Sequence, residues 1–207
     1  MIATEVPVPR RELLLEVAAE LFAARGFHDV GIDDIGAAAG ISGPGVYRHF
    51  ASKAALLEAL CDRALTELLE GAHQAASHEE PRLALEALVD LHVAFAVGRH
   101  ELLGVWAREQ RALPEQVRRA LRRRQRAYEQ PWREVLAPLR ADLTPDEVAV
   151  AVRATLMMLN STARYDAPVG PDRLRALLRQ LALAALLVRP ENPETPVGAV
   201  RRPSSGR

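Results

Sequence analysis

The sequence predicts an all-α fold of about nine helices, and three observations support this class. Ala, Leu, Arg and Glu dominate the 207 residues, whereas aromatic residues, which favour strands, make up only 4%. No run of alternating β-branched residues reaches the length of a strand. Apolar residues instead recur at spacings of three and four along most of the chain. With 49% hydrophobic and 26% charged residues, the composition is that of a globular protein.

Residues that cap or break helices set the expected boundaries. Gly26 and Gly40 end the first two helices, because glycine adopts a left-handed cap without strain. Ser42 and Ser52 are N-caps for the third and fourth helices, and Thr144 begins a capping box for the eighth. We therefore expect helices over residues 10–25, 32–39, 42–50, 52–76, 81–98, 99–112, 114–139, 144–165 and 171–189.

Prolines mark further boundaries. Pro114 and Pro171 stand at helix starts, where a missing backbone N–H is tolerated. Pro131 falls inside the seventh helix and should kink it or split it in two. Residues 190–207 contain four prolines and no apolar periodicity, which predicts a disordered tail. Residues 1–9 are expected to form a flexible N-terminal arm.

Several function classes are disfavoured. The longest apolar run, Leu181 to Val188, is far shorter than the roughly twenty residues that span a bilayer, and no secretory signal is readable. We therefore expect a cytoplasmic protein without a membrane partner. A single cysteine, Cys61, and two histidines without a carboxylate at ligand spacing, His92 and His100, predict neither disulfide, metal nor cofactor. No nucleophile–base pair or phosphate loop is discernible, which argues against an enzyme.

The distribution of charge is more informative than the formal net charge of zero. Residues 1–53 sum to −2, yet residues 40–53 hold Arg48 and Lys53 and no acid. In residues 108–126, eight arginines face only two glutamates. Because a protein that binds nucleic acid needs positive charge only where it touches the phosphates, a neutral chain is compatible with such a partner.

The segment from Ile32 to Phe50, IDDIGAAAGISGPGVYRHF, predicts a helix-turn-helix. Two short helices are joined by a tight turn, and Gly36 and Gly40 stand where the two backbones approach most closely. The second helix of such a pair fits the major groove of DNA, although a helical hairpin in an ordinary all-α protein is the alternative. The apolar positions that the crossing should bury are Ile35, Ala39, Ile41 and Val46.

The surrounding sequence, GFHDVGIDDIGAAAGISGPGVYRHFASKAALLEAL, resembles the DNA-binding domain of the tetracycline-repressor (TetR) family of bacterial transcriptional regulators. The resemblance covers roughly residues 10–60 and is densest in the Ala-Gly-Ile-Ser turn and in Tyr-Arg-His-Phe followed by Ser-Lys. It departs at Val30-Gly31, where the family often has a hydroxyl pair, and at Gly45, where Thr or Ala is frequent.

The resemblance implies a domain organisation and a function. Residues 10–53 would form the DNA-binding domain, a helix from about residue 53 the connector, and residues 54–189 a ligand-binding and dimerisation domain. The implied function is that of a ligand-released repressor that binds a palindromic operator as a homodimer. A ligand-sensing or scaffolding dimer without DNA binding is the alternative, which the negative sum of residues 1–53 favours slightly, and an all-α enzyme ranks below both.

The expected DNA contacts lie in and beside the third helix. Tyr47 and His49 would hold backbone phosphates, and Arg48 is the first candidate for a base contact. Lys53, at a helix N-terminus, would bind a phosphate, and Phe50 should be a core residue. The whole predicted set is Ser42, Gly43, Pro44, Gly45, Tyr47, Arg48, His49 and Lys53.

The helices over residues 144–165 and 171–189 are apolar over more than one narrow stripe. Such helices need cover on two sides, as in an intermolecular four-helix bundle, so we expect a homodimer through them. The resemblance also implies a pocket for a small hydrophobic effector among the middle helices. The side chains expected to line it, with plain core packing as the alternative, are Phe95, Trp106, Tyr128, Trp132, Met157 and Asn160.

A cluster of arginines precedes this pocket in the sequence. Because guanidinium groups clamp phosphates, the cluster is a candidate anion seat, with a solvated helix face as the alternative. The C-terminal part loosely resembles TetR-family regulators that answer to acyl-CoA thioesters, so an acyl-CoA is one candidate effector. The arginines of the candidate seat are Arg119, Arg122, Arg123 and Arg126.

Overall fold

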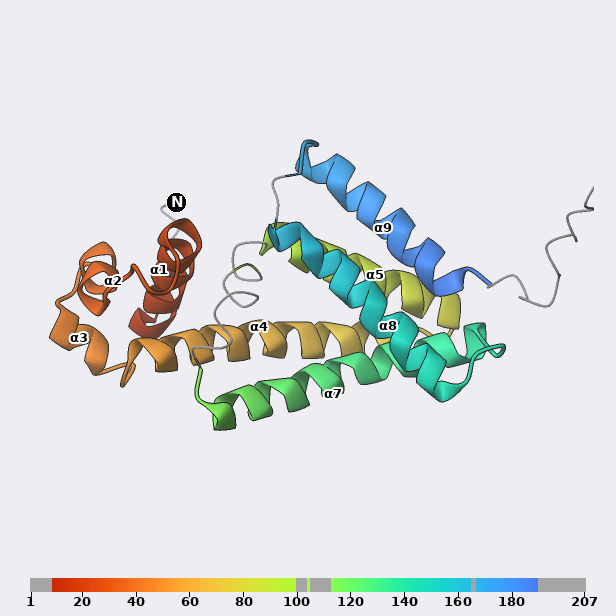
Figure 1. Ribbon diagram of the computed structural model, residues 1–207, viewed down its shortest axis with the longest axis horizontal. Coiled ribbons are helices and arrows are strands. Elements are labelled where there is room, and N and C mark those ends of the chain that lie inside the picture. Colours follow the sequence, from red (N-terminus) through yellow and green to blue (C-terminus); the bar gives the residue numbers. More distant parts are fainter. Residues whose placement is uncertain (1–8, 100–103, 105–112, 165–166, 190–207) are drawn as a thin grey trace, which may run out of the picture.

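The computed structural model describes residues 9–99, 104, 113–164 and 167–189, and within these ranges the chain is helical without strands (Figure 1). The all-α prediction is confirmed. The helices are α1 (Arg10–Arg25), α2 (Ile32–Ala38), α3 (Gly43–Tyr47), α4 (Lys53–Ala76), α5 (Pro81–Gly98), α7 (Glu115–Leu139), α8 (Pro145–Asn160) and α9 (Pro171–Leu187), with a short 3₁₀ helix at Ser161–Arg164. Apart from residues 99 and 104, the predicted sixth helix lies outside the described residues, as do residues 1–8 and the predicted tail at 190–207.

Most predicted helix ends are correct to within two or three residues. Ser52 accepts a hydrogen bond from the Ala55 N–H at 3.0 Å, and Thr144 forms the expected capping box with Glu147. Ser42 occupies the N-cap position of α3, but its side chain makes no capping hydrogen bond. The α-helical part of α8 is shorter than predicted, because the chain tightens into the 3₁₀ turn at Ser161.

Pro131 does not split the helix in two, since α7 continues through it as one helix, and the kink that was the other expectation stays a prediction. Proline removes one backbone hydrogen bond from the helix interior. Pro131 and its neighbour Trp132 are both buried, and Trp132 is wholly enclosed in the core. Packing of this helix face therefore offsets the missing hydrogen bond.

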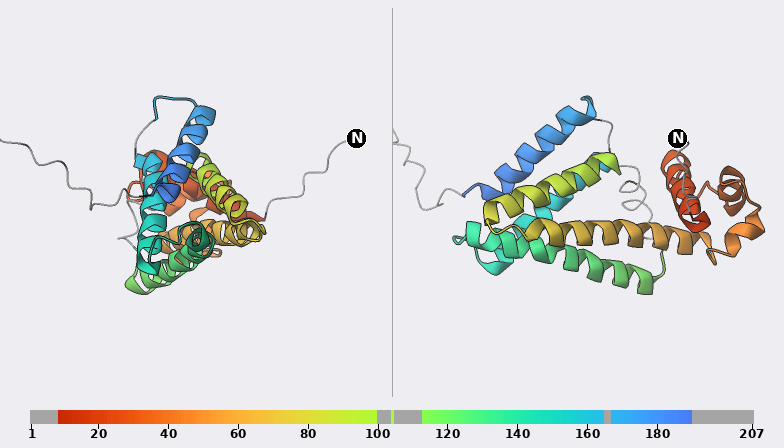
Figure 2. Two further views of the ribbon diagram at one scale, coloured as in Figure 1. Left: turned by 90° about the vertical axis from the view of Figure 1, so that its right-hand side faces the viewer. Right: turned by 180° about the vertical axis from the view of Figure 1, so that it is seen from behind.

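The molecule has two parts joined by one long helix. Helices α1, α2 and α3 form a small group at one end, and α4 runs from this group into a larger bundle with α5, α7, α8 and α9 (Figures 1 and 2). In the larger part, α4 packs against α5 and α7, while α9 packs against α5 and α8. Helix α4 is thus the main physical link between the two ends of the chain.

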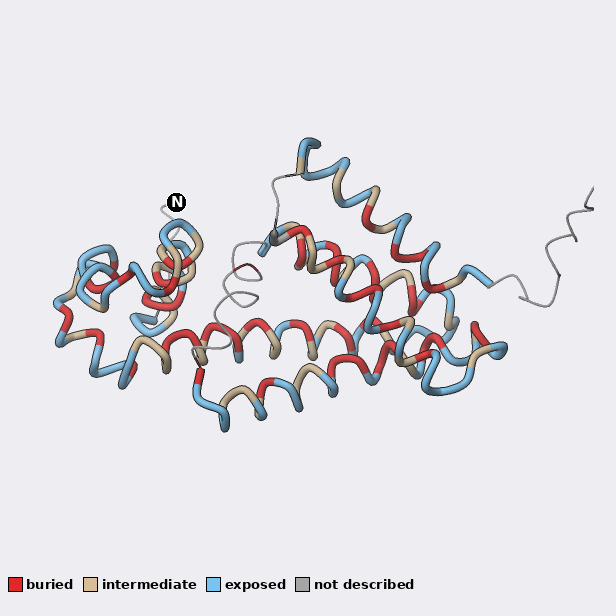
Figure 3. Tube along the Cα trace, in the orientation of Figure 1, coloured by how far each residue is buried: buried red, intermediate tan, exposed pale blue. Residues whose placement is uncertain are grey.

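Two hydrophobic cores lie largely in these two parts (Figure 3). Helix α4 contributes to both, and α7 also adds Leu121 to the N-terminal core. The N-terminal core takes Leu56, Leu57 and Leu60 from the first half of α4. The C-terminal core takes Leu68 and Ala72 from the second half. The first turns of α4 therefore pack as part of the N-terminal unit, beyond the domain boundary expected at residue 53.

Candidate functional site

The α2–α3 pair has the geometry of a helix-turn-helix. A Cβ atom added to Gly36 would lie 2.9 Å from the carbonyl oxygen of Ile41, so the two segments meet here without room for a side chain. Gly40 supplies the turn, with φ of +70°, in a region that favours glycine. Ile35 and Val46 are fully buried between the helices. The predicted close approach is therefore confirmed at Gly36, whereas Gly40 serves the turn.

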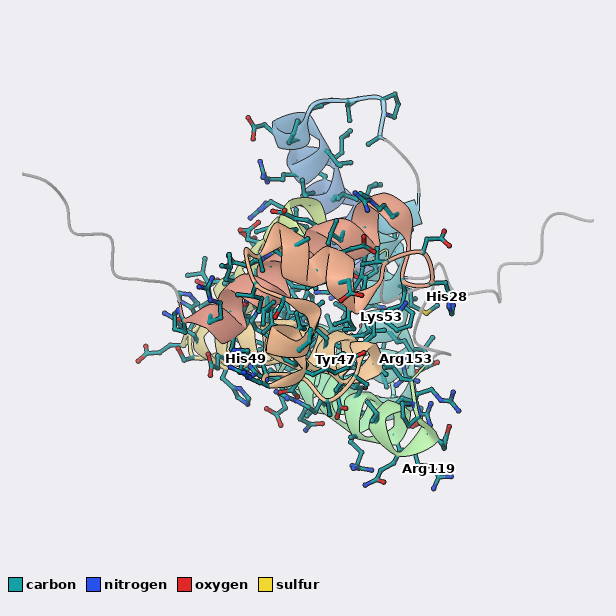
Figure 4. The ribbon with its side chains drawn as sticks, turned by 90° about the vertical axis from the view of Figure 1, so that its left-hand side faces the viewer. His28, Tyr47, His49, Lys53, Arg119 and Arg153 are labelled. Atoms are coloured by element: carbon teal, nitrogen blue, oxygen red, sulfur yellow. The ribbon has the colours of Figure 1, made fainter. Side chains whose placement is uncertain are left out.

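The outer side of this motif presents an exposed polar surface. Tyr47 is 55% exposed at the end of α3, and Arg48 and His49 follow it at the surface. Figure 4 shows Tyr47 and His49 at the helix-turn-helix end of the molecule. Within the described chain, the Arg48 guanidinium forms no ion pair, so its donors are available. Ser42 and Pro44 are also exposed, Gly45 is half-buried, and Phe50 is a core residue as predicted.

Gly43 and Lys53 do not lie where the predicted DNA contacts need them. Gly43 is buried, and its Cα lies so close to the Asp33 carboxylate that a Cβ would collide with it. The Lys53 ammonium donates to the carbonyl oxygens of Phe27, His28 and Val30, at 2.6, 3.3 and 2.8 Å, and lies 4.5 Å from the centre of the Phe27 ring.

An ammonium has three N–H donors, so these three carbonyls use the whole hydrogen-bonding capacity of Lys53. A phosphate contact of this side chain would require it to give up one of these hydrogen bonds, and it stays a prediction. Lys53 fastens the first turn of α4 to the loop between α1 and α2 (Figure 4). Gly43 is buried and packs the motif together beside Asp33.

Ion pairs tie the middle of α4 to helices on both sides. Arg63 of α4 donates to Glu12 of α1 at 2.8 Å. Arg124 of α7 contacts the carboxylate of Asp62 and donates to the hydroxyl of Thr66 at 2.7 Å. Movement of this part of α4 would thus displace contacts both with the helix-turn-helix unit and with α7.

A cavity of about 300 Å³ lies beside the same stretch of α4. Helices α4, α5, α7 and α8 all contribute to its wall, at the level where the two hydrophobic cores meet on α4. A volume of this size suits a small organic ligand. The lining residues are Cys61, Ala64, Leu65, Leu68, His92, Phe95, Gln125, Tyr128, Glu129, Arg153, Leu156, Met157 and Asn160.

Four of the side chains predicted for an effector pocket line this cavity: Phe95, Tyr128, Met157 and Asn160. The prediction is wrong for Trp132, which is fully buried in the C-terminal core and does not line it. Its position on the inward face of α7 is that of a packing residue, which was the alternative. Trp106 lies outside the described residues.

The polar part of the cavity wall centres on His92, which the sequence did not single out as a pocket residue. His92 is 2% exposed, with Nδ1 2.9 Å from the Tyr128 hydroxyl and Nε2 3.0 Å from the Asn160 amide oxygen. Burial lowers the pKa of His92 to about 4, so its imidazole is neutral at physiological pH. Burial also raises the pKa of the Tyr128 hydroxyl, which therefore keeps its proton.

An ion pair between a buried carboxylate and an exposed guanidinium completes the wall. Glu129 of α7 is 8% exposed and accepts two hydrogen bonds from the Arg153 guanidinium of α8, at 3.2 and 2.8 Å. The Arg153 side chain itself is 56% exposed and stands at the outer edge of the cavity. Sequence reasoning missed both residues, because they lie 24 positions apart on different helices and no local spacing connects them.

The arginines of the candidate anion seat are exposed on α7 and do not line the cavity. Arg119 and Arg122 each donate to Glu115, at 2.9 Å, and their hydrogen bonds, with that of Arg118, lower the pKa of Glu115 to about 2. Arg123 and Arg126 lie at the surface. The structure thus favours a solvated, internally compensated helix face for this cluster.

Within the described ranges, no group of three or more His, Cys, Asp or Glu side chains is arranged to hold a metal ion. Over the same residues, no helix has both the length and the apolar content that crossing a membrane requires. The exposed end of the helix-turn-helix and the cavity on α4 are two features of the described residues that can carry a function.

Comparison with known proteins decides between the helix-turn-helix and an ordinary helical hairpin. The family model described as "Bacterial regulatory proteins, tetR family" matches residues 14–60, and the model "Tetracyclin repressor-like, C-terminal domain" matches residues 78–188. The chain belongs to the TetR family. The resemblance seen in residues 10–60 is thereby confirmed and extends to the C-terminal part. TetR-family proteins are transcriptional regulators.

Individual relatives agree with this placement. The chain is 40% identical over 86 residues to the HTH-type transcriptional activator FasR of Mycolicibacterium smegmatis. This match covers 39% of each protein. It is 34% identical over 101 residues to the HTH-type transcriptional repressor KstR2 of Rhodococcus jostii, covering 48% of this chain and 50% of that protein. The matched region thus spans half or less of these curated relatives.

The fold extends further than the sequence matches. The solved structure of a TetR-family transcriptional regulator from Bordetella parapertussis superposes with a TM-score of 0.72 and 30% identity. The superposition covers 84% of this chain and 93% of that one. Both parts of the molecule therefore share the family architecture.

Proposed function

We propose that this TetR-family chain is a DNA-binding regulator, not an enzyme, that binds a palindromic operator as a homodimer and releases it when a small, mostly apolar effector enters the cavity. The observation that carries the proposal is the course of α4. One end of this helix is fastened beside the helix-turn-helix by Lys53, and its middle lines the cavity through Cys61, Ala64 and Leu65.

The exposed side of α3 supports the DNA-binding part of the proposal. Tyr47 and His49 can donate to phosphates, and Arg48 can reach a base edge in the major groove. Because Lys53 is engaged by backbone carbonyls, we assign discrimination and phosphate binding to the exposed set alone. Ser42, Pro44 and Gly45 stand beside it, where close backbone approach and DNA shape contribute.

The test uses fluorescence anisotropy on duplexes from the region upstream of the gene and on scrambled duplexes of equal length. Wild-type protein should prefer the upstream duplex, with affinity that falls steeply as salt rises. Arg48→Ala should lose this preference by about tenfold, while Arg123→Ala, exposed on α7, should not. Equal losses on both duplexes for Arg48→Ala would reject its base contact, and no binding at low salt would favour the sensing dimer without DNA binding.

Exposed apolar side chains on α8 and α9 support the homodimer. Val150 and Met157 on α8 are each 68% exposed, and Leu181 on α9 is 53% exposed. Exposed apolar side chains gathered on adjacent helices are typical of protein–protein interfaces. In a two-fold dimer, the two α3 helices would enter successive major grooves, about one helical turn apart or a multiple of it.

Leu181→Arg should convert the dimer to monomers in sedimentation velocity, because a charge would be buried in the interface without a partner. The matched control is Leu83→Arg, at a position on α5 that is 51% exposed. This control should leave the dimer intact. Monomeric wild-type protein, or an unaltered Leu181→Arg dimer, would contradict the proposed interface.

Effector entry would act by shifting a population between two arrangements of α4. A ligand held by residues of α4, α5, α7 and α8 would move the middle of α4. Two contacts would transmit this movement to the DNA-binding unit: Arg63 with Glu12, and Lys53 with the α1–α2 loop. Changing the separation of two recognition helices by a few ångströms spoils simultaneous docking. Such coupling is typically worth about 1–3 kcal/mol.

An acyl-CoA remains a predicted effector that the structure does not favour. The arginines expected to seat its phosphates lie on the outside of α7, and Arg119 and Arg122 are already paired with Glu115. Isothermal titration with octanoyl-CoA tests this prediction directly. Heat of binding that disappears in Arg123→Ala or Arg126→Ala would restore the anion seat.

A further inference from the structure

Resting on the proposed function, we infer the chemical class of the effector: an uncharged, apolar molecule with one hydrogen-bond acceptor of the carbonyl type, bound against the His92–Tyr128–Asn160 wall of the cavity. The inference follows from the direction of the hydrogen bonds in this wall and from the balance of charge around it.

The direction of the hydrogen bonds is fixed by the contact between His92 and Asn160. A neutral imidazole has one N–H donor and one acceptor nitrogen. Because Nε2 faces the Asn160 amide oxygen at 3.0 Å, Nε2 must carry the proton. Nδ1 then accepts from the Tyr128 hydroxyl, 2.9 Å away, so the single O–H of Tyr128 is used inside the wall.

This arrangement leaves the Asn160 amide donor of the wall without an acceptor. The Asn160 amide oxygen accepts from His92, and its NH₂ group has no hydrogen-bond partner within the described chain. Asn160 lines the cavity, and its NH₂ nitrogen is not among the fully buried atoms that lack a partner. In the described part of the protein, the one fully buried side-chain polar atom without a partner is the indole nitrogen of Trp132. The Trp132 ring packs edge-on against His92 and Tyr128, with ring centroids 6.1 and 6.2 Å away, but it does not line the cavity, so its N–H is not a donor that a ligand would meet.

A ligand that brings an acceptor would satisfy the Asn160 amide, which is costly to leave unbonded once water is displaced. The remainder of the cavity is lined largely by Ala64, Leu65, Leu68, Phe95 and Leu156, which suit an apolar body. A volume of about 300 Å³ corresponds to about ten water volumes, and so to about ten non-hydrogen atoms.

The charges of the site argue against a free carboxylate. His92 is neutral, since desolvation holds its pKa far below neutrality. The one cation of the described wall, Arg153, already makes two hydrogen bonds to Glu129, which also pairs with Arg133 at 3.8 Å outside the wall. An entering anion would therefore be desolvated without a free counter-charge and would also face the Glu129 carboxylate. An entering cation would gain no free counter-charge either, because the Glu129 carboxylate is already paired with Arg153.

The test titrates the full-length protein with matched pairs of about ten non-hydrogen atoms. Nonan-2-one is compared with octanoate, and 4-phenylbutan-2-one with 3-phenylpropanoate, by isothermal titration at neutral pH. At least one ketone should bind, at least tenfold more tightly than its carboxylate partner. Carboxylates that bind as tightly as the ketones, or ketones that do not bind, would overturn the inference.

A variant assigns the binding to the proposed wall. Asn160→Asp keeps the shape and the acceptor for His92 but replaces the free NH₂ donor with oxygen, and should weaken ketone binding at least fivefold. The control, Gln74→Glu, makes the same amide-to-acid change at an exposed position of α4 and should bind as wild type does. Unaltered ketone binding by Asn160→Asp would refute the role of this wall.

The comparison of ligand pairs is made on wild-type protein, so it stands even where the variant folds poorly. The DNA assay separates this inference from the proposed function. A carboxylate that binds more tightly than the ketones and releases the upstream duplex would overturn the inference and support the function. Ketone binding by a protein that binds no DNA would support the inference and contradict the proposed function.

Discussion

The two hydrophobic cores of this chain differ in how they treat polar groups. In the N-terminal core, the helices of the helix-turn-helix pack closely at Gly36. The polar groups there are satisfied, because Lys53 donates hydrogen bonds to three backbone carbonyls. In the C-terminal core, a cavity remains, and an imidazole, a hydroxyl and an amide form part of its wall. A closed core holds a DNA-reading surface in place, whereas an open one can respond to a ligand.

The largest expected effect concerns the closed core. Lys53→Met removes the ammonium and leaves the carbonyls of Phe27, His28 and Val30 without their donor. Hydrogen bonds to a charged group are each worth about 1.5–3 kcal/mol, so partial solvation of this site leaves a loss of roughly 3–4 kcal/mol in the free energy of unfolding. Urea denaturation followed by circular dichroism measures it.

Arg48→Met is the control, since its side chain is exposed and forms no ion pair in the described chain. It should lose DNA affinity without losing stability. A Lys53→Met protein as stable as wild type, but weaker on all DNA sequences, would instead restore the phosphate contact that the sequence suggested.

The next effect concerns the buried histidine of the open core. The folded-state pKa of His92, about 4, lies below the ordinary value of 6.5, so the unfolded chain binds a proton that the folded chain excludes. Its contribution to stability is therefore complete above pH 6.5 and is lost as the pH falls towards 4. The loss amounts to about 3 kcal/mol at the acidic end.

Unfolding free energies of wild type and His92→Gln, measured from pH 7 to pH 4, isolate this contribution, because the other titrating groups are shared. The variant should show a shallower decline than wild type below pH 6.5. Parallel pH profiles would mean that His92 is protonated as easily in the folded protein as in the unfolded chain.

Gly36→Ala tests the tightness of the helix-turn-helix. Its Cβ would meet the Ile41 carbonyl oxygen at 2.9 Å and the Gly43 nitrogen at 3.2 Å, and both are backbone atoms that cannot easily yield. Overpacking of this kind costs about 1–3 kcal/mol. A thermal unfolding curve that matches wild type would show that α2 and α3 separate freely.

The smallest expected effect is a gain, from Gly45→Ala. Here the added Cβ would lie 3.4 Å from Ile41 Cδ1, a contact that a side-chain tip can accommodate, and alanine favours the helix by up to about 1 kcal/mol. The melting temperature should rise slightly. A clear fall would indicate that the backbone around Gly45 is less helical than the structure shows.

The same contrast explains what the sequence could predict. Helix ends at Gly26, Ser52 and Thr144 depend on local capping, and the helix-turn-helix depends on spacing within nineteen residues, so both could be read directly. Sites built from separate helices could not. The His92–Asn160 contact joins residues 68 positions apart, which no local pattern encodes.

Lys53 and Trp132 show the limit of reading charge and size alone. Lys53 has the position of a phosphate ligand, yet the loop from Phe27 to Val30 curls back to offer it three carbonyls, a contact over more than twenty residues. Trp132 has the size of a pocket residue, but the rotation of α7 places it in the packed core while Tyr128, one turn earlier, reaches the cavity.

The central claim is that the cavity and the DNA-reading surface are coupled through α4, and a substitution that fills the cavity tests it without any ligand. Leu156→Trp adds bulk from α8, far from the helix-turn-helix, whereas Leu83→Trp adds it at the surface of α5. Anisotropy on the upstream duplex should show about fivefold or weaker affinity for Leu156→Trp and wild-type affinity for Leu83→Trp. A folded Leu156→Trp protein that no longer binds ketones yet holds the duplex as tightly as wild type would contradict the coupling.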